Sequence, residues 1–107
     1  MVIGDIYWAD VPFENRPGSK IRPVIVIDAE PTPTVAVLKA TSQFQPNLKL
    51  LYSIDFDAPR YYRLPLRGKS YFYKESLIEL ELSRFVRRIG MLHQQDLAGI
   101  VKAVEAL

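Results

Sequence analysis

An arginine directly before a proline, Arg22-Pro23, stands at the start of the apolar run Val24-Ile25-Val26-Ile27. Four β-branched residues in succession favour a buried strand over a helix. Proline restricts the preceding residue to extended conformations and has no N–H for a sheet, so we expect Pro23 to be the first residue of the strand. Arg22 then holds a permanent charge at a strand entrance, where it either serves a site or is an ordinary surface arginine.

Two other patterns that could do chemistry have ordinary structural interpretations. Asp55 and Asp57 could form a metal-binding pair, but Pro59 follows and no third ligand is nearby, so we interpret them as a solvated strand end. His93 precedes a helical pattern and is interpreted as a helix-start residue. With no cysteine and one histidine, the sequence excludes disulfides, thiolate metal sites and multi-histidine metal cages, and predicts no metal or cofactor.

The segment from Arg60 to Lys74 combines five cations with five aromatic residues and has no acidic residue. Guanidinium groups bind phosphate and aromatic faces stack bases, so this segment could form a groove for single-stranded nucleic acid. A hairpin whose aromatic residues fill the core and whose cations are solvated is an equal alternative. The net charge is only +2, but residues 59–107 carry a surplus of four positive charges. This asymmetry suggests an anionic partner.

Strands and one helix must position these residues, and 107 residues with 49% hydrophobic content fit a single domain over 1–107. Alternating and apolar patterns predict six strands. Besides the strand after Arg22, they run from Ile3 to Val11, Thr34 to Gln43, Leu48 to Phe56, Ser76 to Leu82 and Phe85 to Met91. A helix is expected from Gln94 to Ala106, where apolar residues recur at helical spacing. Apolar residues on both faces of the first strand favour a small closed or nearly closed barrel.

The connections add two expectations. Pro12 to Ile21 forms a long loop that ends directly at Arg22, and loops of this length in small domains tend to be functional or mobile. Glu30-Pro31-Thr32-Pro33 predicts a turn, because its prolines cannot continue a strand. No apolar run reaches the roughly 20 residues that span a bilayer, and no signal peptide is recognisable. We therefore expect a cytoplasmic protein without membrane contact.

Four short motifs follow one another along nearly the whole chain, before a helix that opens at Asp96-Leu97. They are Gly4-Asp5-Ile6-Tyr7-Trp8, Arg22-Pro23-Val24-Ile25-Val26, Ala40-Thr41-Ser42-Gln43 and Arg88-Ile89-Gly90-Met91-Leu92. In this order they resemble the MazF/PemK family of type II toxin–antitoxin toxins. The resemblance implies a mainly β fold with a C-terminal helix, an SH3-like (MazF/CcdB-type) β-barrel, that forms a homodimer and binds a cognate antitoxin. It also implies metal-independent, sequence-selective cleavage of single-stranded RNA through the substrate 2′-OH.

The resemblance assigns residues as well. Arg22 and Thr41 correspond to the family's usual catalytic pair. The implied substrate-binding residues are Ser42, Gln43, Glu14, Arg16 and Lys20. A planar guanidinium suits the oxygens of a phosphorane, and a threonine hydroxyl adds a hydrogen bond in a preorganised site. Three departures keep an alternative open: the segment from Arg60 to Lys74 matches no block of the family, the loop before Arg22 has a single glycine, and His93 stands where the family often has serine. The alternative is a non-catalytic barrel, degenerate or similar to a gyrase poison, that binds nucleic acid or a protein partner.

Overall fold

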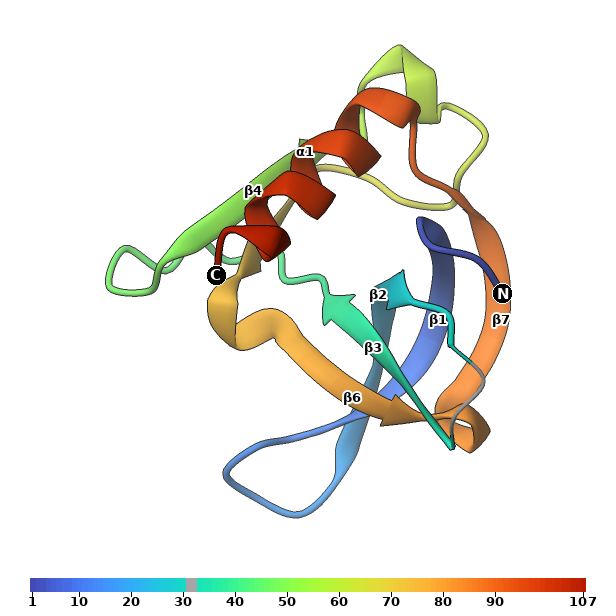
Figure 1. Ribbon diagram of the computed structural model, residues 1–107, viewed down its shortest axis with the longest axis vertical. Helices are drawn as coiled ribbons and strands as arrows, with labels where there is room; N and C mark the ends of the chain where they lie inside the picture. Colours follow the sequence, from blue (N-terminus) through green and yellow to red (C-terminus); the bar gives the residue numbers. More distant parts are fainter. Residues whose placement is uncertain (31–32) are drawn as a thin grey trace.

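The computed structural model describes residues 1–30 and 33–107, which contain seven strands and one α-helix (Figure 1). The strands are β1 Asp5–Pro12, β2 Ser19–Asp28, β3 Thr34–Lys39, β4 Leu50–Asp55, β5 Lys69–Tyr73, β6 Leu77–Glu81 and β7 Phe85–Met91. The helix is α1 Gln94–Glu105, and short 3-10 helices lie at η1 Pro59–Tyr61, η2 Lys74–Ser76 and η3 Leu82–Arg84. The predicted mainly β fold with a C-terminal helix is confirmed.

The strands form two antiparallel sheets. Five pair in the order β6-β3-β2-β1-β7, and β4 pairs with β5 in a separate hairpin. An isolated bridge between Thr41 and Tyr71 joins the two sheets. Within the described residues no ladder pairs β6 with β7, which are joined by η3 and form the two edges of the five-stranded sheet. Hydrogen bonding therefore does not close the strands into the barrel that the sequence favours.

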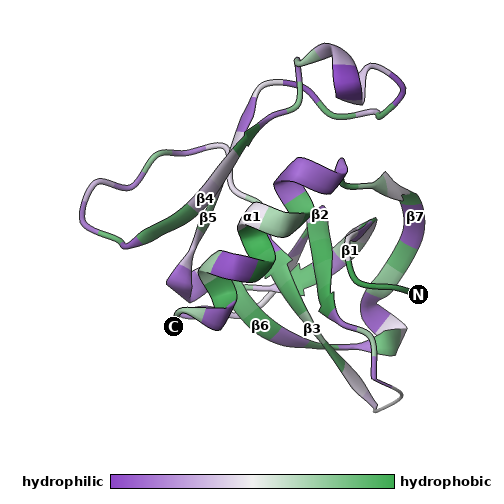
Figure 2. Ribbon diagram, turned by 45° about the horizontal axis from the view of Figure 1, so that its top comes forward, coloured by the Kyte–Doolittle hydropathy of each residue, from purple (hydrophilic) through white to green (hydrophobic). Residues whose placement is uncertain are grey.

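Side chains on both faces of the large sheet are buried, as the pattern of the first strand predicts. Ile6, Ile25 and Leu38 face a core that also receives α1 and the β4–β5 hairpin, whereas Ala9 and Val24 face a second core. Figure 2 shows hydrophobic residues along the central strands and along the side of α1 that faces them. Burying one large aliphatic side chain contributes about 1.5–3 kcal/mol, so two cores hold the centre of the sheet rigid.

The structure shows that the expected start of the second strand at Pro23 is wrong. The strand begins at Ser19 rather than at Pro23, which lies inside it opposite Trp8. The carbonyl of Pro23 accepts a hydrogen bond from Ala40 N at 3.0 Å. The N–H and C=O of a strand residue point to the same side, so the proline nitrogen, which has no hydrogen, also points toward β3. The β2–β3 hydrogen-bond ladder ends next to Pro23, so its missing donor interrupts no pairing. The preceding loop is correspondingly shorter than the predicted Pro12 to Ile21.

The third and fourth strands are shorter than predicted. β3 ends at Lys39 instead of Gln43, because Gln43 N turns back to the Thr41 hydroxyl oxygen at 3.3 Å. β4 covers Leu50–Asp55 instead of Leu48 to Phe56, and its register with β5 shifts between Leu50 and Tyr52. As a result Leu48 and Leu50 are 36% and 40% exposed, although their alternation with Ile54 predicts burial.

The basic and aromatic segment from Arg60 to Lys74 contains η1 and a strand, β5, that the sequence pattern misses. Tyr61, Phe72 and Tyr73 are buried in the core, as the hairpin interpretation expects, whereas Tyr71 is half-buried and Tyr62 is exposed. The solvated-cation part of that interpretation also holds for Arg60, Arg63, Arg67, Lys69 and Lys74, which are exposed. The segment is therefore mainly structural, although its end reaches the candidate site described below.

The remaining boundaries differ little from the expectations. β7 has the predicted bounds, α1 ends one residue early, and β6 lacks the first and last residues of the predicted Ser76 to Leu82. The first strand starts at Asp5 rather than Ile3, because Gly4 adopts a φ of 95° that a strand residue does not have. The predicted turn at Glu30 to Pro33 lies partly outside the described residues.

Candidate nucleic-acid site

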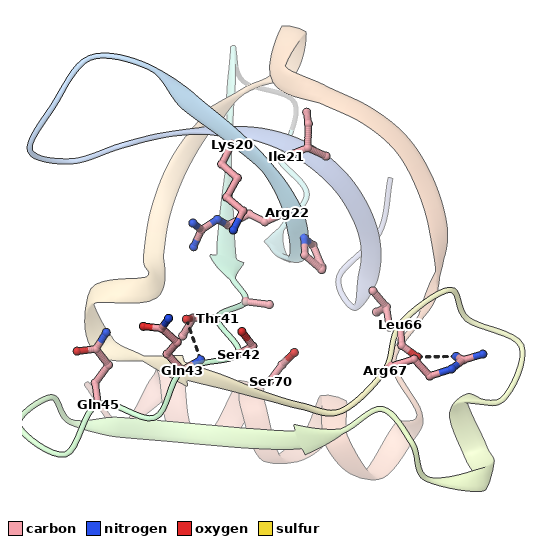
Figure 3. A pocket seen from close by; sticks show the side chains of 12 residues that line it. Lys20, Ile21, Arg22, Thr41, Ser42, Gln43, Gln45, Leu66, Arg67 and Ser70 are labelled. Atoms are coloured by element: carbon pink, nitrogen blue, oxygen red, sulfur yellow. Dashed lines mark hydrogen bonds between the residues drawn. The ribbon is translucent and has the colours of Figure 1, made fainter.

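A pocket of about 480 Å³ opens between the first half of β2 and the segment after β3 (Figure 3). Its polar side chains are those of Lys20, Arg22, Thr41, Ser42, Gln43, Gln45, Arg67 and Ser70. Among the described residues that line it, three are cations and none is acidic. A pocket with this charge favours an anionic ligand, because no carboxylate competes for the guanidinium groups.

Arg22 projects from β2 toward the segment that contains Thr41 (Figure 3). Pairing with Ala9 of β1 fixes its backbone position. Its Nε atom is buried and has no hydrogen-bond partner among the described residues. Its terminal guanidinium nitrogens have no hydrogen bond with a described residue either, and the side chain lines the cavity. The guanidinium group is thus available to an oxygen of a ligand.

Thr41 lies on the opposite wall of the same pocket. Its backbone exchanges two hydrogen bonds with Tyr71, at 3.3 and 2.7 Å, which hold it against β5. Its hydroxyl oxygen accepts the hydrogen bond from Gln43 N, so the hydroxyl hydrogen remains available as a donor. The structure therefore places the two residues of the predicted catalytic pair around one cavity.

Four of the five other predicted site residues line one of two pockets. Lys20, Ser42 and Gln43 line the first. Glu14 lines a neighbouring pocket and forms an ion pair with Lys39 at 3.1 Å. Arg16 lines neither pocket, because its guanidinium carbon lies 4.3 Å from the centre of the Phe13 ring within the loop. The structure thus separates Arg16 from the other substrate-binding candidates.

The sequence pattern missed Gln45, Leu66, Arg67 and Ser70 as lining residues. Arg67 belongs to the basic segment that was considered for nucleic-acid binding. Its Nη1 atom donates to the carbonyls of Leu64 and Leu66, at 3.0 and 2.7 Å, so Arg67 mainly stabilises its own loop. Gln45 has no sequence signal, since only the fold of the segment after Thr41 brings it to the cavity.

An exposed aromatic residue, Phe44, lies between two lining residues of the pocket. Its ring is 58% exposed and meets Tyr71 edge to face at 5.5 Å. Tyr73 holds this segment in place, because its hydroxyl donates to Gln43 O at 3.3 Å and accepts from Gln45 N at 2.5 Å. A rigidly held, exposed aromatic face beside a cationic pocket is suited to stacking a nucleobase.

A cluster around Asp96 attaches the loop after β4 to the helix. Its carboxylate accepts hydrogen bonds from the hydroxyls of Tyr52, at 2.7 Å, and Tyr61, and Arg60 lies 3.8 Å away. Burial and the Asp96 carboxylate raise the pKa of Tyr52 to about 12 and the pKa of Tyr61 far above its ordinary value. Both hydroxyls therefore remain protonated donors; Tyr52 ties β4 to the helix, and Tyr61 positions the loop whose far end supplies Leu66 to the pocket.

Two interpretations from the sequence agree with the local contacts. The His93 ring accepts a hydrogen bond from Gln95 N at 3.2 Å, which is the contact of a helix-start residue. Asp55 accepts a hydrogen bond from Asp57 N at 2.9 Å in the turn after β4, and Asp57 accepts one from Gly68 N, directly before β5, at 3.0 Å. In the described part of the chain, no group of three or more histidine, cysteine or acidic side chains could hold a metal ion. No helix there is long and apolar enough to cross a bilayer.

The profile of the family described as PemK-like, MazF-like toxin of type II toxin–antitoxin systems matches residues 3–107. The chain belongs to this toxin family. The fold of this MazF-like toxin also matches the Mycobacterium tuberculosis toxin MazF-mt6 with a TM-score of 0.67 and 17% identity, over 95% of this chain and 93% of that one. At that identity the match shows a shared fold. No curated protein sequence matches the toxin.

Proposed function

We propose that this toxin is a metal-independent endoribonuclease that cleaves single-stranded RNA at preferred sequences. Membership of the MazF-like family supports the reaction class. The observation that carries the proposal is the shared cavity, which Arg22 lines from β2 and Thr41 lines from the opposite wall. Lys20 adds a further cation, which attracts the phosphate backbone.

In the proposed mechanism the substrate supplies its own nucleophile. The ribose 2′-OH attacks the adjacent phosphorus, the bond to the 5′ oxygen breaks, and a 2′,3′-cyclic phosphate and a 5′-OH form. Arg22 stabilises the charge on the non-bridging oxygens, and the Thr41 hydroxyl donates one further hydrogen bond. Because arginine stays charged at physiological pH, Arg22 acts through its charge and geometry rather than as a base.

The family also supports the other proposed properties. We infer a single SH3-like domain over 1–107, a homodimer, a cytoplasmic location and a cognate antitoxin that competes with RNA. Exposed apolar residues suggest a surface that a partner subunit covers; they include Met1, Val2, Ile3, Val86 and Met91. Sedimentation at micromolar concentration tests the dimer, because a monomer at that concentration contradicts it.

The test of the proposed function is incubation of the purified toxin with a long single-stranded RNA in excess EDTA. We expect discrete fragments that carry 2′,3′-cyclic phosphate and 5′-OH ends, and mapping the ends reports the preferred sequence. RNA that is bound but stays intact contradicts the nuclease and favours the non-catalytic alternative. RNA that is neither bound nor cleaved contradicts both functions.

Replacing Phe44 with alanine is expected to weaken RNA binding without unfolding the toxin. Loss of one base–aromatic stack costs about 1–3 kcal/mol, or roughly a 5- to 150-fold increase in Kd. Fluorescence anisotropy with a labelled oligonucleotide that has 2′-O-methyl riboses measures this effect. Tyr62→Ala is the matched control, because Tyr62 is 68% exposed and lines neither pocket. Equal losses in both variants contradict a specific role for Phe44.

A further inference from the structure

A second, smaller pocket of about 210 Å³ adjoins the cationic one. The two pockets share Arg22, Thr41 and Gln45. A ligand atom held between Arg22 and Thr41 therefore borders both pockets. The second pocket has the Leu48 side chain and the Tyr73 side chain on its wall, and its volume suits a single flat ring system. Its position beside the proposed phosphate site suits the base of an adjacent nucleotide.

The charge of this second pocket differs from that of the first, because two carboxylates, Glu14 and Glu75, balance the cations Arg22 and Lys39 in its lining. Carboxylates repel phosphate and accept hydrogen bonds only, so they suit the N–H groups of a base rather than the RNA backbone. A phosphate in the first pocket and a base in the second would each meet groups of suitable charge.

Most polar groups in the second pocket already have partners. Glu14 binds Lys39 at 3.1 Å, and the Ser76 hydroxyl oxygen accepts Tyr73 N at 2.8 Å. The Tyr73 hydroxyl is occupied by backbone groups of Gln43 and Gln45. Glu75, in η2, has no hydrogen bond or ion pair with any described residue. The side-chain amide of Gln45 likewise has no hydrogen bond with a described residue, so Glu75 is the unpaired carboxylate available to a ligand rather than the sole acceptor.

Building on the proposed ribonuclease function, we propose that this pocket receives the base of a nucleotide flanking the cleaved phosphate, and that Glu75 selects against uracil there. Cytosine, adenine and guanine carry an exocyclic amino group that donates to a carboxylate, and contacts of this kind discriminate between bases. Uracil has a single N–H on this edge, between two carbonyl oxygens. Those carbonyl oxygens repel the carboxylate oxygens, because both are hydrogen-bond acceptors. Glu75 thus acts as a specificity residue, separate from Arg22 and Thr41.

End mapping of cleaved RNA tests this proposal with wild-type toxin and the Glu75→Gln variant. We expect uracil to be depleted at least about fivefold at one of the two positions that flank the wild-type cut. The variant should lose most of that depletion, because a glutamine amide also donates to uracil carbonyls. Glu81→Gln is the matched control, since it removes the same charge from an exposed residue outside both pockets.

Anisotropy with pools of labelled 2′-O-methyl tetranucleotides, each with one position fixed as U, C, A or G, separates this proposal from the nuclease. Wild-type cleavage without uracil depletion, or with a depletion that Glu75→Gln leaves unchanged, overturns the proposal and leaves the nuclease intact. A different result is that the wild type binds uracil-containing oligonucleotides more weakly, in a way that depends on Glu75, without cleaving RNA. That result supports the base pocket and contradicts the nuclease function. If the toxin neither cleaves RNA nor binds it in a base-dependent way, both proposals are overturned.

Discussion

Arg22→Ala is expected to lower the rate of RNA cleavage by about 10²–10³-fold, the usual effect of removing one preorganised group that stabilises transition-state charge. The side chain lies across from Thr41, and its buried Nε has no partner among the described residues. Its loss should therefore affect the reaction more than the fold. Single-turnover cleavage of an RNA that contains the mapped site measures the rate.

Two companion variants make the result specific to Arg22. Arg22→Lys keeps the charge but not the planar fork, so we expect it to recover only a small part of the rate. Lys102→Ala removes an exposed cation from α1, outside both pockets, and should cleave at the wild-type rate. Cleavage by folded Arg22→Ala within threefold of the wild type contradicts the role that we propose for this guanidinium.

Asp96→Ala is expected to lower the free energy of unfolding by about 2–4 kcal/mol, because it leaves two tyrosine hydroxyls without their acceptor. Tyr52 and Tyr61 both donate to this carboxylate, and Arg60 loses its ion-pair partner. Urea denaturation followed by circular dichroism measures the change. Since the exposed Glu105 lies on the same helix, Glu105→Ala is the control and should change stability by less than about 0.5 kcal/mol.

A double-mutant cycle separates the hydrogen bonds from other effects of the Asp96 substitution. Asp96→Ala in a background of Tyr52→Phe and Tyr61→Phe should cost clearly less than in the wild type, because no hydroxyl is then left unpaired. Equal costs in the two backgrounds contradict the proposed network. We also expect slower cleavage by Asp96→Ala, since the loop that Asp96 holds carries Leu66 to the pocket.

The sequence predicted much of the fold correctly in segments whose secondary structure follows from their own residues and not from the segment that they pack against. β-branched runs indicated the interior of β2, and helical spacing with His93 at its start predicted α1 nearly to the residue. Errors arose where a tertiary contact competes with local preference. The register shift beside Tyr52 exposes Leu50, and the missed strand β5 depends on pairing with β4 across an intervening loop.

For the site, the order of short motifs in the sequence determined the family and singled out Arg22 and Thr41. The sequence alone could not show that they border one cavity, that Arg16 lies outside it, or that Glu75 enters the neighbouring pocket. Residue types and their local spacing specify which chemistry is available. Tertiary structure decided which of those groups meet, because strand pairing and burial bring together segments that are distant along the chain.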